Sequence, residues 1–333
     1  MQIGIIANPV SGNVGRRLTA GASISSTHDK VATVKRFLTG FRACSDAEIH
    51  YFDDLDRITI SALDSLRMKG VRIDVEPDGT SDDSIRASRA LKGASLIVSL
   101  GGDGTNRAIA KGWSDAPLLP LSTGTNNAFA TFTEPTVAGV ASAFIANQAL
   151  PLDLISIKSK VIHVDIQGES VPELALVDLV GTKDRFVGSR AIVDPTQYLF
   201  ALLTLADASK VGMVGIGGSL EHIEPNQENG VFLTFNEKSR FEKTVKAAVA
   251  PGLIREVNIN RCKIVPLSDP LICCGPAVLA FDGERDRYLR PNQQITCTVQ
   301  RDGPRLFDVE TTLKEVTRRG LMQQDYKRVL AHA

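Results

Sequence analysis

Residues 95–112 read SLIVSLGGDGTNRAIAKG, and this stretch decides the fold class of the first half of the chain. The apolar run at 94–100 predicts a buried strand, and the glycines after it predict a tight turn into a helix that Thr105 or Asn106 begins. Asp103 is unexpected there, because glycine loops after strands commonly bind phosphate and a carboxylate repels phosphate. The residues alone leave its role open: it caps the helix, or it holds Mg²⁺ or accepts a proton from a hydroxyl group.

Strand-like and helix-like segments alternate on both sides of this stretch. Short apolar or alternating runs predict strands at 2–7, 48–52, 71–75 and 116–121. Amphipathic runs predict helices at 30–41, 58–69 and 81–91. Strands that alternate with helices form parallel sheets, so this order predicts a doubly wound, Rossmann-like α/β domain.

The second half of the chain has a different texture, with strand-length segments separated by turns. Strands are predicted at 152–158, 161–167, 173–181, 231–236, 257–266, 277–282 and 294–300, and one apolar helix at 195–208. Closely spaced strands without helices between them predict an antiparallel β-sandwich. We therefore expect an α/β domain at 1–148, a β-sandwich domain at 149–305 and a C-terminal segment at 306–333 that returns to the first domain.

The composition is that of a globular protein without an excess of either charge. The 333 residues include 38 Lys and Arg against 38 Asp and Glu, and only 5% are aromatic, which argues against a nucleic-acid partner. No uninterrupted apolar run reaches about 18 residues, so no membrane span is expected. Five scattered cysteines without a CxxC pair predict reduced thiols. With no signal peptide at the start, these features indicate a cytoplasmic protein.

Two further polar turns follow predicted strands, as the GGDGT turn does. Asn8-Pro9-Val10-Ser11-Gly12 comes after the first strand, where Gly12 permits close approach of the backbone and Asn8 and Ser11 offer hydrogen bonds. Residues 122–127, STGTNN, follow the strand at 116–121 and offer small polar side chains. Each turn alone is equally a plain polar loop. Because parallel strands end at one sheet edge, the three together predict a nucleotide site there.

Two acidic positions in the second half raise the same question. Asp178 lies within the apolar segment 174–180, so its carboxylate needs a partner such as Lys183 or Arg185, either in a structural ion pair or in a site. The Asp-Gly pair at 282–283 is typical of a hairpin turn. The five histidines have no zinc-ligand spacing.

The combination of GGDGT after a buried strand, NPVSG at 8–12 and FDGE at 281–284 resembles the superfamily of NAD kinases and diacylglycerol or sphingosine-type lipid kinases. Residues 16–31 and 122–129 are most similar to the acetoin-catabolism protein X group, which is classed with the ATP–NAD kinases. The resemblance covers nearly the whole chain. It implies a kinase-type α/β domain followed by a β-domain that binds the phosphoryl acceptor.

The resemblance also implies roles for individual residues. Asp103 is implied as the essential acid, which binds the acceptor hydroxyl group or a metal ion and serves as the base. Asp178 and Glu284 are implied as acceptor-binding acids. ATP, Mg²⁺ and NAD are the implied cofactors and acceptor, and a homo-oligomer is implied because NAD kinases generally assemble so. The implied nucleotide-binding residues are Asn8, Ser11, Gly12, Gly101, Gly102, Gly104, Thr105, Asn106, Thr123, Gly124, Thr125, Asn126 and Asn127.

The leading functional hypothesis is an ATP-dependent kinase that phosphorylates a hydroxyl group of NAD or a related small molecule, with a link to acetoin catabolism. The sequence does not decide between ATP and polyphosphate as the donor. A lipid kinase is the first alternative, supported by the NPxSG and DGE motifs. A non-catalytic nucleotide-binding regulator is the second, because Val177 stands where NAD kinases carry an asparagine that grips NAD.

Overall fold

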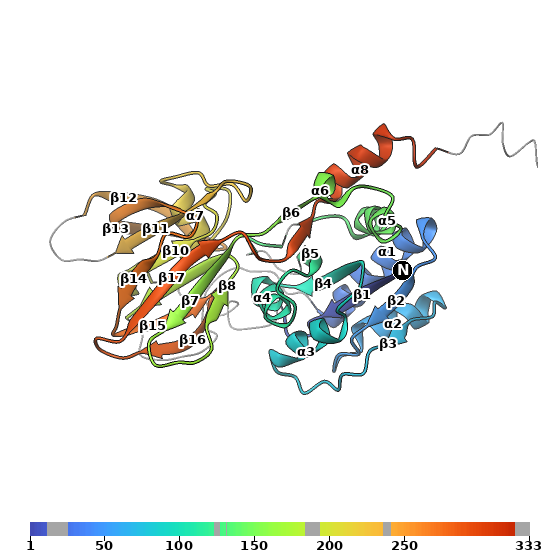
Figure 1. The fold of residues 1–333 in the computed structure, drawn as a ribbon, viewed down its shortest axis with the longest axis horizontal. Coiled ribbons are helices and arrows are strands. Elements are labelled where there is room, and N and C mark those ends of the chain that lie inside the picture. The colour runs from blue at the N-terminus through green and yellow to red at the C-terminus, as the bar shows by residue number, and fades with distance from the viewer. Residues whose placement is uncertain (12–25, 123–126, 131, 184–193, 236–240, 324–333) are drawn as a thin grey trace, which may run out of the picture.

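The computed structural model describes residues 1–11, 26–122, 127–130, 132–183, 194–235 and 241–323. They form an α/β half and a β half that lie side by side (Figure 1). This arrangement confirms the expected fold class. None of the helices in these ranges is both long and apolar enough to cross a membrane.

The first half contains a seven-stranded sheet in the order β3-β2-β1-β4-β5-β18-β6. Its strands run parallel except for the antiparallel pair β18 and β6. The winding direction changes between β1 and β4, so the ends of these two strands form the switch point at which open α/β sheets bind ligands. The strands are β1 (Gln2–Ala7), β2 (Glu48–Tyr51), β3 (Val71–Arg72), β4 (Leu96–Gly101), β5 (Pro117–Ser122), β6 (Ser156–Lys158) and β18 (Arg305–Phe307).

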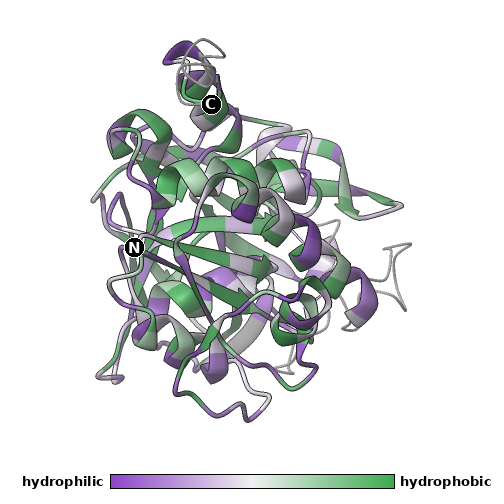
Figure 2. Ribbon diagram, turned by 90° about the vertical axis from the view of Figure 1, so that its right-hand side faces the viewer, coloured by the Kyte–Doolittle hydropathy of each residue, from purple (hydrophilic) through white to green (hydrophobic). Residues whose placement is uncertain are grey.

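Helices cover both faces of this sheet (Figure 1). One face packs against α1 (Thr27–Cys44), α2 (Ile58–Leu66), α5 (Pro135–Ala146) and α8 (Val309–Arg318). The other face packs against α3 (Asp82–Ala90) and α4 (Asp103–Gly112). Figure 2 shows hydrophobic residues concentrated in the central strands and polar residues on the outer sides of the helices.

The second half is a sandwich of two antiparallel sheets, ordered β12-β13-β11-β10-β9-β15-β16 and β14-β17-β7-β8. Side chains from both sheets share one core cluster. Two short helices, α6 (Leu152–Ile155) and α7 (Met213–Gly218), and a 3₁₀ turn, η1 (Pro195–Gln197), accompany them. The strands are β7 (Val161–Ile166), β8 (Glu173–Ala175), β9 (Asp178–Thr182), β10 (Tyr198–Leu203), β11 (Asn229–Phe235), β12 (Lys243–Ala250), β13 (Leu253–Pro266), β14 (Leu271–Cys274), β15 (Ala277–Phe281), β16 (Glu284–Leu289) and β17 (Gln294–Gln300).

The helix expected at 195–208 is wrong. These residues contain β10, which lies between β9 and β11 in the centre of the larger sheet. Five of its six residues are buried, so the run is apolar on both faces and lacks the alternation that marks a half-buried strand. The segment expected as one strand at 152–158 instead begins as α6 and ends as β6.

The two halves share a hydrophobic cluster. Ile109 of α4 and Phe129 pack in one cluster with Leu176, Val177 and Val214 from the second half. Both β6 and β18 belong to the first sheet, so the chain enters and leaves the sandwich beside the same sheet edge. The domain limits 1–148, 149–305 and 306–333 stay a prediction.

A buried carboxylate organises the start of α2. Asp54 is 2% exposed, and its oxygens accept hydrogen bonds from the backbone N–H groups of Asp56 (3.0 Å) and Ile58 (3.1 Å). Burial raises the pKa of Asp54 to about 6, above the ordinary value of 3.8. The folded protein therefore holds a proton on Asp54 over a pH range in which the unfolded chain has lost it.

This difference predicts a pH dependence of stability. The contribution of Asp54 to the free energy of unfolding is highest below about pH 4 and is lost as the pH rises through about 6. An Asp54→Asn variant lacks this dependence. Between about pH 5 and about pH 7.5, the wild type should lose about 1–2 kcal/mol more than the variant in urea unfolding. Parallel pH profiles for the two proteins would contradict this assignment.

Candidate functional site

The first two predicted turns meet at the switch point between β1 and β4. The backbone N–H of Asn8 donates to the carbonyl oxygen of Leu100 (2.9 Å), and the Asn8 side-chain amide donates to the Thr105 hydroxyl oxygen (2.8 Å). The other end of that side chain accepts from the N–H of Val10 (2.9 Å). Asn8 thus ties the turn after β1 to the GGDGT turn after β4.

The third turn joins them at Gly102. Asn127 donates from its side-chain amide to the hydroxyl oxygen of Ser122, at the end of β5 (2.8 Å). A Cβ atom at Gly102 would lie 3.1 Å from Oδ1 of Asn127 and 3.7 Å from Oγ of Ser11. The three turns therefore meet closely at Gly102, where the absence of a side chain lets Asn127 and Ser11 approach the backbone. Gly12 and residues 123–126 lie outside the described residues.

Asp103 is the first residue of α4, and Gly102 is the N-cap residue. The helix therefore begins before Thr105 and Asn106, the two residues at which the sequence predicted its start. The Asp103 carboxylate contacts another segment: Oδ2 accepts from the N–H of Ala128 (2.8 Å), and Oδ1 accepts from the N–H groups of Phe129 (3.1 Å) and Ala130 (3.4 Å). The cap position belongs to Gly102, which corrects the capping alternative. The Asp103 side chain instead binds the backbone of residues 128–130, which follow the third turn, to the GGDGT turn.

Asn106 supports the turn from below. Its side chain is fully buried, accepts from the Ser99 hydroxyl group (2.6 Å) and donates to the carbonyl oxygen of Gly102 (3.1 Å). These contacts shape the GGDGT backbone. A contact between Asn106 and a nucleotide stays a prediction. Gly101 is the last residue of β4, and a Cβ atom there would lie 2.5 Å from Oγ1 of Thr105.

The Asp282-Gly283 pair forms the expected hairpin turn between β15 and β16. The Asp282 carboxylate binds the backbone of residues 176–178. Asp282 is buried and accepts hydrogen bonds from the N–H groups of Leu176 (2.9 Å), Val177 (2.7 Å) and Asp178 (3.1 Å). These bonds explain why the strand expected at 173–181 is interrupted between β8 and β9. Burial raises the pKa of Asp282 to about 6, and the positive charge of Arg107 opposes that rise.

The two acceptor-binding acids expected in the second half occupy different places. A Cβ atom at Gly104 would lie 2.5 Å from Oε1 of Glu284, so the Glu284 carboxylate packs directly on the GGDGT helix. Asp178 begins β9, and its carbonyl oxygen accepts from the N–H of Asp282 (2.9 Å). Arg185, one of its expected partners, lies outside the described residues.

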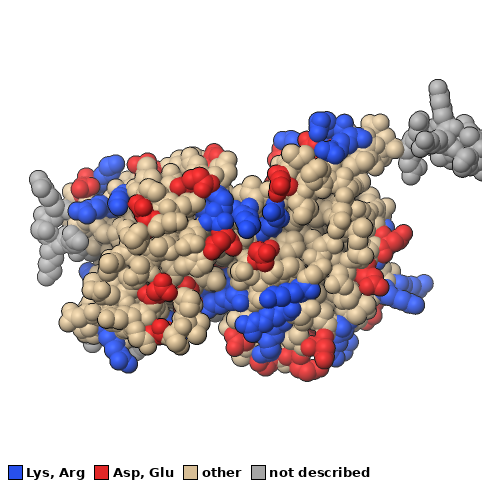
Figure 3. Space-filling model, viewed as in Figure 1, with Lys and Arg blue, Asp and Glu red and all other residues tan. Residues whose placement is uncertain are grey.

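Glu284 and Gly104 line a cavity of about 160 Å³ together with Arg107, Lys111 and the start of α3. Figure 3 shows basic side chains gathered over α3 and α4 and at the junction between the halves. The cavity therefore has both acidic and basic walls, and it opens beside the GGDGT turn.

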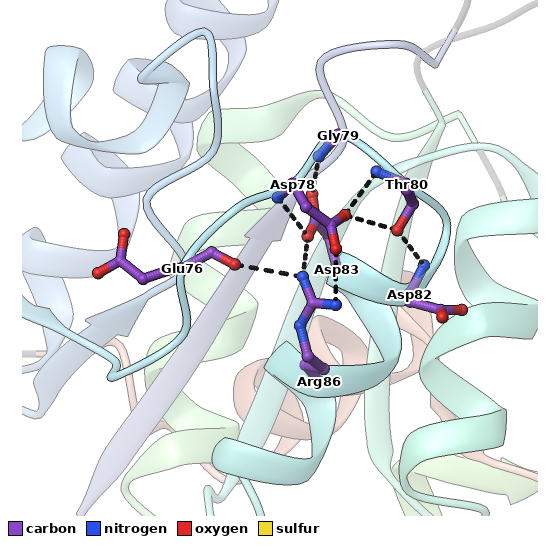
Figure 4. A network of polar contacts seen from close by, with 7 residues as sticks. All are labelled: Glu76, Asp78, Gly79, Thr80, Asp82, Asp83 and Arg86. Carbon is purple, nitrogen blue, oxygen red and sulfur yellow. Dashed lines mark hydrogen bonds and ion pairs between the residues drawn. The ribbon is translucent and has the colours of Figure 1, made fainter.

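A closed polar network fixes the start of α3 beside this cavity (Figure 4). The Asp83 carboxylate accepts from the N–H groups of Asp78 (3.0 Å) and Gly79 (2.9 Å). The Arg86 guanidinium group donates to the Asp83 carboxylate and to the Asp78 carboxylate, the latter at 2.9 Å. The hydrogen bond from the Thr80 hydroxyl group, followed by that from Arg86, lowers the pKa of Asp78. The network holds the loop that leads into α3 in one conformation.

Sequence reasoning missed Lys30. Its side chain is 1% exposed, and Nζ donates to the carbonyl oxygens of Asn8 (3.2 Å) and Pro9. A positive charge thus lies directly behind the first turn. The signal was present, because Lys30 shares the buried face of α1 with Val34 and Phe37.

Within the described ranges, no three His, Cys, Asp or Glu side chains form a group that could hold a metal ion. Asp103 supplies one carboxylate at the switch point, and three backbone amides already occupy part of its acceptor capacity. A Mg²⁺ ion bound mainly through substrate phosphates needs only one or two protein carboxylates. The residues present therefore fit a phosphate-bound Mg²⁺ and not a dedicated metal cage.

Comparisons with known proteins agree with this geometry. Residues 3–149 match the ATP-NAD kinase N-terminal domain, and residues 160–302 match the acetoin catabolism protein X C-terminal domain. The first half of the chain is therefore similar to NAD kinases and the second half to acetoin catabolism protein X. The GGDGT turn and the switch point lie in the NAD kinase-like part, whereas Asp178 and Glu284 lie in the part that matches the protein X domain.

One curated protein similar to this chain is acetoin catabolism protein X of Cupriavidus necator, which is 29% identical over 336 residues, covering 96% of this chain and 94% of the relative. Among solved structures, yeast NADH kinase complexed with NADH superposes with a TM-score of 0.55 at 12% identity, covering 95% of this chain and 86% of that one. At this identity the second comparison bears on the fold alone.

Proposed function

We propose that this protein transfers the γ-phosphoryl group of ATP to a hydroxyl group of NAD or a related small molecule. The observation that carries the proposal is the convergence of three turns on Gly102, with Asp103 beside them and Glu284 on the facing half. The NADH complex of the yeast enzyme, which shares the fold, supports a dinucleotide as acceptor. A role in acetoin catabolism is supported by the name of the Cupriavidus relative.

The nucleotide phosphates would bind at the three turns. Gly102 offers backbone without a side chain, and Ser11 and Asn127 offer polar groups within 4 Å of the position that a Cβ atom would fill. The N-terminus of α4 carries partial positive charge, and Lys30 adds a full charge behind the first turn. This cradle suits a negatively charged phosphate.

The acids would then serve the acceptor and the metal ion. The phosphate oxygens would hold Mg²⁺, which would supply positive charge against the transferred phosphoryl group. Three N–H bonds leave about one of the four acceptor sites of the Asp103 carboxylate, and that site would either contact the Mg²⁺ or orient the acceptor hydroxyl group and accept its proton. Glu284, from the other half, would bind the acceptor close to Gly104.

A second candidate function is a nucleotide-binding regulator without catalysis. Two observations favour it: three backbone amides engage the Asp103 carboxylate, and Val177 is a buried apolar residue where NAD kinases carry an asparagine. If the Asp103 carboxylate serves only to bind the backbone of residues 128–130, the protein would bind a nucleotide but transfer no phosphoryl group.

One experiment separates these functions. Purified protein with Mg²⁺ and γ-labelled ATP is incubated with NAD, NADH, diacylglycerol or sphingosine, and ATP binding is measured by calorimetry in parallel. We expect the label in the dinucleotide. Label in a lipid would establish the lipid-kinase alternative, and binding without transfer would establish the regulator. Absence of nucleotide binding would overturn both proposals.

A further inference from the structure

A buried ion cluster joins the two halves at the cavity. The Glu173 side chain of β8 is 8% exposed and contacts three cations. Its Oε2 lies 2.7 Å from Nη2 of Arg107 and 2.5 Å from Nζ of Lys111, both on α4. Its Oε1 lies 3.1 Å from Nη2 of Arg287 on β16. The helix that begins at Asp103 is therefore tied to two strands of the sandwich.

Arg107 makes two further contacts across the junction. Its side chain is 6% exposed, and Nε donates to the carbonyl oxygen of Leu174 (2.7 Å). The guanidinium carbon of Arg107 lies 4.7 Å from the centre of the Phe281 ring. Phe281 directly precedes Asp282 in the hairpin turn. The planar Arg107 side chain thus contacts both β8, through Leu174, and the turn between β15 and β16, through Phe281.

Arg107 also lies one helical turn after Asp103, on the same side of α4. We propose that Arg107 is a positioning residue that sets the turn carrying Glu284 against the GGDGT helix, so that Asp103 and Glu284 act on one acceptor. The proposal rests on the proposed kinase function. Arg107 is assigned no contact with the reacting atoms. Its effect is transmitted through Phe281 and the Asp282 carboxylate, which binds the backbone of residues 176–178.

The cluster offers a matched pair of variants. Arg107→Met removes the contacts with Leu174, Phe281 and Glu173, but leaves Glu173 paired with Lys111 and Arg287. Lys111→Met removes a cation from the same carboxylate without touching Leu174 or Phe281. Its side chain is also 27% exposed, so the loss of charge is better solvated. Both variants remove one cation from Glu173, so a difference between them reports the contacts of Arg107 with Leu174 and Phe281 and its buried charge beside Asp282.

The hydrogen bonds that Asp282 accepts can be followed by amide exchange, a measurement that does not depend on phosphoryl transfer. The charges of Arg107 and Asp103 on α4 act on Asp282, and Asp178 of β9 lies beside it, joined by two hydrogen bonds through its backbone groups. The Arg107 charge lowers the pKa of Asp282, so Arg107→Met should raise that pKa further. Protonated Asp282 is a poorer acceptor for the amides of residues 176–178. These amides should then exchange faster with solvent deuterium near neutral pH.

The test measures steady-state kinetics with the labelled-ATP assay, ATP binding by calorimetry, and amide exchange of residues 176–178. For Arg107→Met we expect ATP binding within about twofold of wild type and kcat/KM for the acceptor lower by about 10²-fold, because a misplaced acceptor loses proximity. The acid limb of its pH profile should move to higher pH. Arg107→Lys should recover part of the rate.

Lys111→Met should stay within about threefold of wild type in all three measurements, as a partly exposed charge pair contributes little. Equal kinetics and equal amide exchange for the two variants would overturn the proposal. A folded wild type that transfers phosphate to no acceptor would overturn the proposed kinase function. Faster exchange in Arg107→Met would, in that case, still establish the structural coupling without a catalytic role.

Discussion

Asp103→Asn should reduce phosphoryl transfer by about 10²–10⁴-fold, the usual contribution of a positioned general base. Asparagine is neutral, so it neither accepts the proton of the acceptor hydroxyl group nor attracts Mg²⁺. ATP binding should persist, because the cradle around Gly102 is built from the turns and from Lys30. Transfer of label from ATP and calorimetric binding of ATP measure the two effects separately.

The same substitution should cost some stability. In wild type the carboxylate accepts from three N–H groups at 128–130, whereas an asparagine side chain turns one oxygen into a donor that faces a donor. We expect a loss of about 1–3 kcal/mol in urea unfolding. Asp115→Asn, at an exposed position beyond the other end of α4, is the matched control and should change neither quantity. Normal transfer by Asp103→Asn would exclude the proposed mechanism.

Gly139→Ala should have the largest effect on folding. Helices α1 and α5 meet backbone to backbone at Gly139 and Gly40. A Cβ atom at Gly139 would overlap the carbonyl oxygen of Phe37 and lie 2.7 Å from the amide nitrogen of Phe41. Because backbone cannot rotate away as a side chain can, the helices must move apart and Phe37 and Phe41 lose packing.

Two terms of opposite sign decide the size of this effect. Alanine is favoured over glycine in a helix by about 1 kcal/mol, whereas overpacking against a rigid neighbour costs about 1–3 kcal/mol or more. The loss of contacts at the buried α1–α5 interface adds to the cost, so we expect a net loss of at least about 2 kcal/mol in urea unfolding. Val137→Ala, at an exposed position on α5, should change stability by less than about 0.5 kcal/mol. A Gly139→Ala variant as stable as wild type would show that the helices separate freely.

Much of the fold was predictable, because period and turn chemistry are local. The apolar runs that became β1 and β4 and the amphipathic run that became α1 needed no tertiary information. The exception, β10, is buried on both faces, and an apolar run without alternation fits a strand and a helix equally.

The candidate site was predictable only in part. Three turns after parallel strands were visible in the sequence, and the structure joins their described residues at Gly102. The contact between Gly104 and Glu284 could not be read from the chain, because it depends on how two halves pack. Glu173 and Arg107 gave no signal either, since a buried pair is recognised only once both partners are placed.

The path of the chain through the first sheet has a consequence for synthesis. Strand β18 and helix α8 add Phe307, Val309 and Val316 to the core on one face of that sheet. The first half thus lacks part of its core until the residues up to Val316 have left the ribosome. The sandwich is an insertion in the α/β domain, and the domain that begins first is completed last.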